Sequence, residues 1–210
     1  MELDFLRSVN IFSDLSDPEL KNVKNVCQTR SYPKNSMIIL EEEMGDVVFV
    51  VMSGTVKITR VNDEGKEVIL AMLGSGEVFG EMAILDGESR SANALAQENC
   101  EVVTINREEF LNIIRSYNKV ALNLMTEFAI RLRKSDQQIE ALSLDDAEHR
   151  IGVSILNLAE EMGVIRKGAV TVKNLPYQQD IANMAGTSRE TVSRVMKTFE
   201  ERGLINKTGH

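Results

Sequence analysis

Hydrophobic and polar positions follow three different patterns along the chain. From Gln28 to Thr104, short apolar runs of β type are separated by turns that contain glycine. From Arg107 to about Leu142, apolar residues recur four and three positions apart, and after residue 144 the helical spacing returns in shorter segments. Many short strands followed by helices predict an α+β protein with an N-terminal β-roll, a long helix and a C-terminal helical domain.

The β-type region predicts a roll or barrel of the double-stranded β-helix type, because its strands are short and its turns are evenly spaced. Short helices are expected before it, in residues 1–27, with a helix start at Ser13 or Ser16 followed by Asp17-Pro18-Glu19. The clearest strand predictions are Met37–Leu40, Val47–Met52, Thr55–Val61, Val68–Met72 and Val102–Ile105.

The long helical run has no Pro or Gly and predicts a single helix of roughly 50 Å. Its narrow apolar stripe has coiled-coil spacing, so we expect it to pair with a second copy of the chain. Continued at that spacing, the stripe becomes polar at Arg131, Ser135 and Gln138. Polar seam positions set register or contact something else, so a plain dimer helix and a ligand at the seam both remain open. The stripe comprises Phe110, Ile114, Tyr117, Ala121, Leu124 and Phe128.

The C-terminal third predicts a helix–turn–helix. After a break and hinge at Ser143–Asp146, where Asp145 with Glu148 or Asp146 alone can cap a helix, we expect a helix at 150–163 and a strand at 169–173. Within residues 178–197, small Ala182 permits close helix approach, Gly186 suits a turn with positive φ, and Ser188 can cap the second helix. An ordinary helical hairpin is the alternative.

Composition restricts the function. The 210 residues are 43% hydrophobic and 27% charged, with no apolar run long enough to cross a membrane and no leader pattern, so we expect a soluble cytoplasmic protein. Two cysteines, Cys27 and Cys100, form neither a disulfide framework nor a metal-ligand pattern. Net charge is −8, but residues 145–210 carry nine basic and nine acidic side chains, so DNA is not excluded as a partner.

One segment of the roll carries candidate binding chemistry. Gly80 precedes a short helix-prone run, which would offer backbone N–H groups to an anion, and Arg90 can present a guanidinium fork to a phosphate. Glu81 would suit a ligand that also has hydroxyl groups, because a carboxylate accepts hydrogen bonds from a ribose. A strand is expected to resume at Arg90–Ala92. The alternative is a simple Arg–Glu surface pair.

The motif Gly45-Asp46, Gly54, residues 79–85 and Arg90-Ser91-Ala92 resembles the cyclic-nucleotide-binding domain, and the whole chain resembles the CRP/FNR family of bacterial transcription regulators. The resemblance implies that Glu81 binds a ribose hydroxyl, that Arg90 and Ser91 bind a cyclic phosphate, and that the long helix contacts adenine of cyclic AMP. Asp136 departs from the hydroxyl expected there and leaves the base open. The implied ligand residues are Gly80, Glu81, Met82, Ala83, Arg90, Ser91, Ala92, Ser135 and Asp136.

The segment 188–194 resembles the recognition helix of that family. Arg189 and Arg194 can each bond guanine O6 and N7, Glu190 can accept from cytosine N4, and neighbouring hydroxyls suit phosphates. The resemblance implies a TGTGA-like palindrome read by a homodimer with helices about 34 Å apart, and RNA polymerase as a further partner. The expected DNA-binding residues are Ser188, Arg189, Glu190, Thr191, Ser193 and Arg194.

Other function classes fit less well. A cupin-type enzyme needs clustered histidines, whereas His149 and His210 both lie outside the roll, and no catalytic triad or Walker pattern occurs. An iron–sulfur or haem sensor lacks its ligands, so we expect no metal and no haem. A ligand-independent regulator is the remaining alternative. The expected domains are 1–106 for the roll with its N-terminal helices, 107–143 for the dimerisation helix and 144–210 for the winged helix–turn–helix, with a truncated or unusually short wing.

Overall fold

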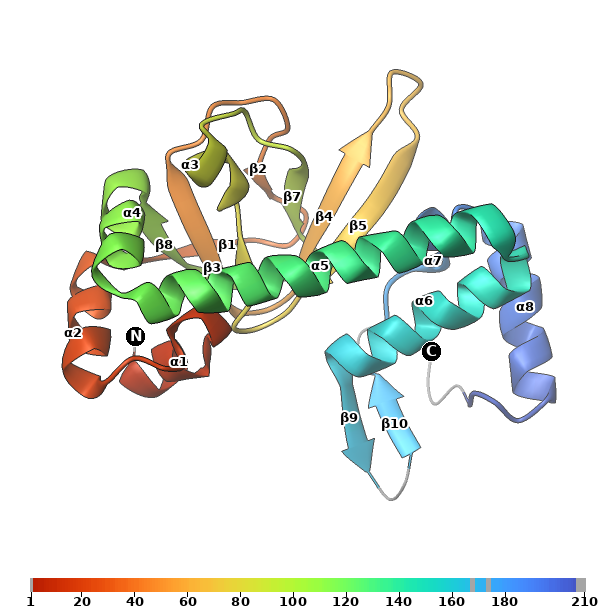
Figure 1. The fold of residues 1–210 in the computed structure, drawn as a ribbon. Helices are drawn as coiled ribbons and strands as arrows, with labels where there is room; N and C mark the ends of the chain where they lie inside the picture. Colours follow the sequence, from red (N-terminus) through yellow and green to blue (C-terminus); the bar gives the residue numbers. More distant parts are fainter. Residues whose placement is uncertain (1, 167–168, 173–174, 207–210) are drawn as a thin grey trace. The chain divides into compact units, whose positions relative to one another are not determined.

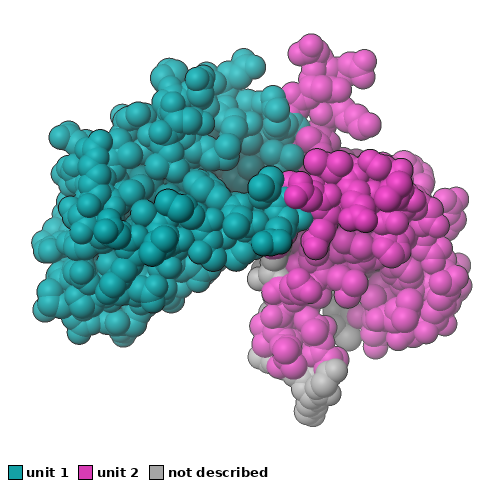
Figure 2. Space-filling model, viewed as in Figure 1, with its two compact units in different colours: residues 1–60, 70–133 teal, residues 61–69, 134–210 magenta. Residues whose placement is uncertain are grey.

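A computed structural model describes residues 2–166, 169–172 and 175–206 (Figure 1). The chain divides into two compact units, shown in Figure 2, one of residues 1–60 and 70–133 and the other of residues 61–69 and 134–210. None of the helices in the described ranges is long and apolar enough to cross a membrane.

The roll consists of two four-stranded sheets with the strand orders β1-β8-β3-β6 and β2-β7-β4-β5. β3 pairs antiparallel with both β8 and β6, and β7 pairs antiparallel with β2 and β4. The predicted α+β class with a β-roll is thereby confirmed. The strands are β1 (Gln28–Tyr32), β2 (Met37–Ile39), β3 (Val47–Ser53), β4 (Val56–Val61), β5 (Glu67–Leu73), β6 (Val78–Phe79), β7 (Asn93–Ala96) and β8 (Cys100–Asn106).

β3 reads as an unbroken apolar run because both of its faces are covered. Val48 and Val50 face a core that β8 shares with the helices, while Phe49 and Val51 face a second core between the two sheets. The Phe49 ring stacks on Phe79 with centroids 5.0 Å apart. Both faces of β3 are therefore packed against apolar side chains.

Short N-terminal helices pack against one face of β3 and β8. They are α1 (Leu3–Ser8), a 3-10 helix (Asn10–Phe12) and α2 (Asp17–Val26). α2 begins as predicted, with Pro18 in its first turn and the Glu19 carboxylate accepting from the backbone N–H of Ser16 at 2.7 Å. Their apolar side chains are buried in one cluster with residues of the next two helices.

The single long helix predicted from Arg107 is wrong, because the chain forms α4 (Arg107–Ser116) and α5 (Asn118–Leu144). Tyr117 leaves the helical conformation with φ −127° and ψ 89°. Both helices bury apolar side chains in the same core, so the chain must bend between them, and the poor helix formers Ser116, Tyr117 and Asn118 lie at the bend. The Tyr117 hydroxyl accepts from Asn22 at 3.1 Å and fixes the bend to α2.

The predicted dimer stripe is also wrong in its first half. Phe110 is 0% exposed and Leu124 5% exposed, and both belong to the core beneath the N-terminal helices. That core covers the stripe within one chain, so these side chains cannot meet a second copy. A second series on α5, one position away, is exposed at alternating spacings of three and four: Leu122, Met125, Ala129, Leu132, Asp136, Ile139 and Ser143.

The C-terminal unit contains α6 (Ala147–Met162), a hairpin of β9 (Gly163–Arg166) and β10 (Ala169–Val172), α7 (Gln178–Ala185) and α8 (Arg189–Glu201). Asp146 rather than Asp145 caps α6, since its carboxylate accepts from the backbone N–H of His149 at 2.8 Å. The predicted strand at 169–173 is confirmed as far as Val172. The shortened wing was expected at 207–210, which lies outside the described residues.

Candidate functional site

The segment from Gly80 to Ala92 connects β6 to β7. Gly80 adopts a positive φ of 75°, and α3 (Met82–Asp86) follows, as the sequence indicated. Residues 90–92 are irregular and β7 begins only at Asn93, so the strand predicted at Arg90–Ala92 is wrong. The backbone of Arg90 instead bridges another loop, donating to Glu43 O at 2.9 Å and accepting from Glu42 N at 2.9 Å.

Arg90 points into the roll rather than out of it. Its side chain donates to Gly80 O at 2.6 Å and to Val47 O at 2.8 Å, and Arg90 is only 7% exposed. Its guanidinium carbon lies 5.8 Å from the centre of the Phe49 ring. Burial lowers the pKa of Arg90 below its usual value, opposed by the carboxylates of Asp46 and Glu81. Arginine still keeps its charge, so this cation is held close to the anion site predicted from the sequence.

Two glycines leave room for this arrangement. A Cβ on Gly45 would lie 2.0 Å from Arg90 Nε, and a Cβ on Gly80 would lie 2.7 Å from Arg90 Nη1. Gly45 and Gly80 therefore leave the space that the Arg90 guanidinium occupies. Gly80 also has a positive φ of 75°, which is a second reason for a glycine at this position.

Glu81 is a buried carboxylate with a guanidinium partner. It is 2% exposed, and its Oε1 accepts from Arg131 Nη1 at 2.7 Å. Burial raises the pKa of Glu81, although the charges of Arg131 and Arg90 act in the opposite direction. The Arg–Glu surface pair considered from sequence thus does not describe this site, because the pair formed is with Arg131 and its carboxylate is buried.

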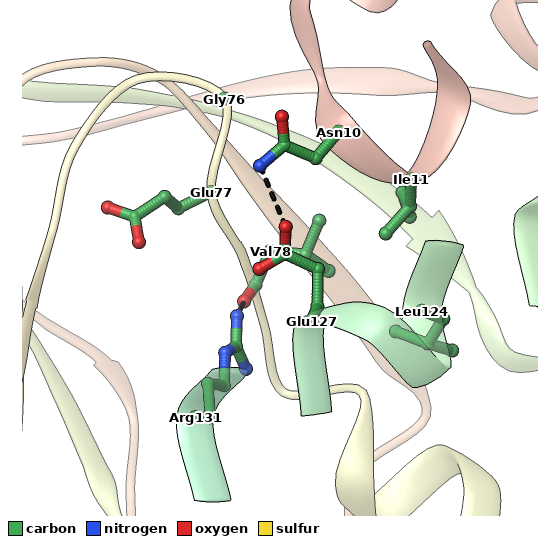
Figure 3. A pocket seen from close by; sticks show the side chains of 8 residues that line it. All are labelled: Asn10, Ile11, Gly76, Glu77, Val78, Leu124, Glu127 and Arg131. Atoms are coloured by element: carbon green, nitrogen blue, oxygen red, sulfur yellow. Dashed lines mark hydrogen bonds between the residues drawn. The ribbon is translucent and has the colours of Figure 1, made fainter. Parts of the chain in front are cut away.

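Arg131 is a residue of this site that the sequence analysis did not assign to it. It comes from α5, donates also to Val78 O at 2.5 Å, and lies beside a shallow hollow between α5 and the loop before β6. In Figure 3 its guanidinium points toward Val78, while Asn10 donates to Glu127 Oε1 at 2.7 Å across the same hollow. The signal for it in the sequence is its charge at the position where the apolar stripe of the long helix becomes polar.

The other predicted ligand residues divide into two groups. Met82 and Ser91 are exposed neighbours, with 3.9 Å between the hydroxyl and the sulfur, whereas the Ala83 side chain is buried and Ala92 is half-buried. These residues lie together with Glu81 and Arg90. Ser135 and Asp136 lie on α5 in the second unit and are exposed, so their part in the site stays a prediction.

The helix–turn–helix forms where the sequence predicted it. Gly186 takes φ +58° after α7, and Ala182 is completely buried between the helices. Ser188 caps α8, since its hydroxyl accepts from Thr191 N at 3.2 Å. Ser188 and Thr191 also lie 3.1 Å apart through their hydroxyls, so both are held at the helix start.

The exposed face of α8 is polar. Val192, Val195 and Met196 are buried, whereas the remaining face presents its charged side chains and Ser193 to solvent. The backbone N–H of Glu190 and the Ser188 hydroxyl hold the pKa of Glu190 below its usual value, so this carboxylate is an acceptor at neutral pH. The face comprises Arg189, Glu190, Ser193, Arg194 and Lys197.

Comparison with known proteins identifies the family. The chain is 36% identical over 195 residues to the cyclic AMP receptor protein of Thermus thermophilus, covering 93% of this chain and 87% of that one. The chain belongs to the CRP/FNR family of transcription regulators. Within this CRP-type regulator, residues 29–117 match the cyclic nucleotide-binding domain and residues 149–210 match the Crp-like helix-turn-helix domain.

Further relatives support the same assignment. The cAMP-activated global transcriptional regulator CRP of Haemophilus influenzae is 32% identical over 195 residues, covering 92% of this chain and 86% of its own. The solved structure of the Thermus thermophilus catabolite activator protein matches with a TM-score of 0.59 and 34% identity, covering 95% of this chain and 91% of that chain. The chain therefore combines a cyclic nucleotide-binding domain with the helix-turn-helix domain of a CRP-type transcription regulator.

Proposed function

We propose that the protein is a homodimeric transcription regulator in which cyclic AMP, bound in the roll, controls binding to a TGTGA-like palindrome. The observation that carries this proposal is that Glu81 and Arg90, two side chains of one segment of the roll, are both buried. A hydrogen-bond acceptor and a guanidinium in the same segment match a molecule that has both hydroxyl groups and a phosphate.

The proposed binding step is an exchange of hydrogen-bond partners. Arg90 uses two side-chain bonds to carbonyls of Gly80 and Val47, and a guanidinium has more N–H donors than these two bonds require. A phosphate at Ser91 can therefore be bonded without complete release of Arg90 from the roll. Glu81 would accept a hydrogen bond from a ribose hydroxyl. Because Arg131 on α5 donates to the same carboxylate, a movement of the Glu81 side chain would change the hydrogen bond of Arg131.

Cyclic AMP is the preferred effector because the relatives from Thermus thermophilus and Haemophilus influenzae carry it in their names. Asp136 is the residue that argues for testing other bases, since a carboxylate accepts hydrogen bonds that guanine N1–H and N2–H can donate. The alternative is a regulator of the same family whose roll binds no nucleotide or a different effector.

We assign the dimer contact to the exposed series on α5 rather than to the stripe first predicted. Leu122, Met125, Leu132 and Ile139 are all exposed and repeat at the spacing of a coiled-coil seam. Asp136 occupies a seam position among them, where a polar residue sets register at a cost in stability. Two copies joined along this series would bury side chains that a single chain leaves in water.

The polar face of α8 is the proposed reading surface. Arg189 and Arg194 would bond guanine edges and Glu190 a cytosine amino group, each pair contributing roughly 1–3 kcal/mol of discrimination. Ser188 and Thr191 hydroxyls, fixed by the cap, would contact phosphates. We also propose RNA polymerase as a partner once the dimer is on DNA.

Titration calorimetry tests the effector. The wild-type protein is titrated with cyclic AMP, cyclic GMP and cyclic di-GMP, beside Arg90→Lys and the control Arg60→Lys, whose exposed side chain pairs with Glu41. We expect binding of cyclic AMP by the wild type and the control, and a loss of at least tenfold in Arg90→Lys. Binding to none of the three nucleotides would support the ligand-independent alternative.

A further inference from the structure

One side chain in the C-terminal unit bonds two segments that lie far apart in the sequence. Arg150, on the first turn of α6, donates from Nε to Ala185 O at 2.8 Å and from Nη2 to Gly186 O at 3.5 Å. The same guanidinium donates from Nη1 to Asp145 O at 2.7 Å. Arg150 therefore connects the turn of the helix–turn–helix to the linker between α5 and α6.

The three carbonyls are suited to a cation. Ala185 ends α7 and Gly186 follows it in the left-handed conformation, so their carbonyls belong to a helix C-terminus, which lacks intrahelical partners and carries partial negative charge. Asp145 continues the hydrogen-bonding pattern of α5, because its N–H donates to Ala141 O at 3.0 Å. Bonding Asp145 O thus amounts to bonding the end of α5.

A second contact joins the same two places. A Cβ on Gly186 would lie 2.8 Å from Leu142 Cδ2, so the last turn of α5 packs directly against the turn of the helix–turn–helix. Ser188, the cap of α8, follows Gly186 by two residues. The cap of the recognition helix therefore lies two residues from a glycine that contacts the last turn of α5.

We propose that Arg150 is a positioning residue that fastens the turn before α8 to the end of α5, so that a movement of α5 carries the recognition helix with it. This inference rests on the proposed control of DNA binding by a nucleotide, and it names the contact through which that control reaches α8. A guanidinium suits this role because its five N–H donors are spread over three nitrogens in a fixed plane, so it can bond carbonyls on different segments at once. A lysine at this position would supply one point charge.

Two variants and one control separate this role from plain stabilisation. Arg150→Met removes all three bonds, Arg150→Lys keeps the charge, and Arg202→Met removes a different α6–α8 contact, the exposed pair of Arg202 with Glu148 at 3.0 Å. For each protein, DNA affinity for a TGTGA palindrome is measured by fluorescence anisotropy without and with saturating cyclic AMP. Calorimetry measures cyclic AMP affinity.

We expect Arg150→Met to lower the ratio of the two DNA affinities by about fivefold or more, the lower end of ordinary allosteric coupling. Arg150→Lys should recover only part of the ratio, and cyclic AMP affinity in the roll should stay within about twofold of wild type. An equal loss of DNA affinity with and without cyclic AMP would overturn the proposal, because that is the result of simple destabilisation. So would an equal fall in the ratio for Arg202→Met.

A wild type that does not respond to cyclic AMP would contradict the proposed function but not the role of Arg150. Amide hydrogen exchange, measured without nucleotide, tests that role independently. In Arg150→Met, segments 142–146 and 185–188 should both exchange faster, while Arg202→Met leaves them unchanged. Unchanged exchange, or faster exchange in only one of the two segments, would show that Arg150 does not fasten them.

Discussion

Removal of the Arg131 side chain would leave the buried carboxylate of Glu81 without its guanidinium partner, and the loss of stability can be estimated from this pair. Loss of one partner from a fully buried ion pair costs about 3–5 kcal/mol, because the other charge remains buried and unpaired. Here the Glu81 side chain is 2% exposed, but that of Arg131 is 35% exposed, so water already screens the pair. We therefore expect Arg131→Met to lower the free energy of unfolding by roughly 2 kcal/mol at pH 7.

A double-mutant cycle measures this interaction by urea unfolding, followed by circular dichroism. The cycle combines Arg131→Met with Glu81→Gln, and Arg133→Met on the same helix is the control for losing an arginine. Once Glu81 is uncharged, Arg131→Met should cost much less, leaving a coupling energy of about 1–2 kcal/mol. The control should stay within about 0.5 kcal/mol of wild type. Additive effects of the two substitutions would refute the reasoning.

The pH dependence of the same variants provides an independent check. Burial raises the pKa of Glu81 above its ordinary value of 4.5, so the folded protein holds this proton more tightly than the unfolded chain does. Stability from this group is then fully present below pH 4.5 and is lost as pH rises toward the higher folded pKa. Glu81→Gln should remove that loss, so it should be neutral or stabilising at pH 7 while weakening nucleotide binding. Destabilisation at pH 7 would contradict the account.

Three further predictions follow from single positions. Gly45→Ala should displace the Arg90 guanidinium and lower the free energy of unfolding in urea by roughly 1–3 kcal/mol. The control Gly74→Ala, whose added Cβ has its nearest atom at 3.9 Å, should leave that free energy unchanged. An equal loss of stability in both variants would contradict this reasoning. Leu132→Asp should shift the dimer toward monomer in sedimentation, because Leu132 belongs to the exposed series on α5. Ile130→Asp, which lies outside that series, should not. An unchanged dimer in both variants would contradict the assignment of the dimer contact to this series. Burial raises the pKa of the Cys27 thiol to about 12, so native protein at pH 8 should resist iodoacetamide that reacts in urea; equal rates would contradict this.

Local features of the fold could be predicted from the sequence because they depend on nearby residues. The strand Val47–Met52, the turn at Gly186 and the cap at Ser188 each follow from periodicity or from one residue's conformational preference. The break at Tyr117 could not be predicted in this way. No Gly or Pro marks it, and its cause is packing of α4 and α5 into one core, which only the tertiary structure contains.

The same limit applies to the site. Residue types at Gly80, Glu81 and Arg90 indicated an anion and hydroxyl site, but not that Arg90 would bond the carbonyl of Val47. Two apolar series on α5 differ by one position, and the choice between core and seam depends on the N-terminal helices that cover one of them. The partners of Arg131 and Arg150 are distant in sequence, so no local pattern points to them.

The central claim is that a nucleotide in the roll strengthens binding of α8 to a specific DNA sequence. The most direct measurement is the affinity for a TGTGA palindrome, by fluorescence anisotropy, as cyclic AMP is titrated from zero to saturation, with scrambled DNA of the same composition in parallel. The account predicts that cyclic AMP tightens binding to the palindrome by tenfold or more and leaves scrambled DNA nearly unchanged. Affinity for the palindrome that does not respond to cyclic AMP, or an equal response on both DNAs, would contradict it.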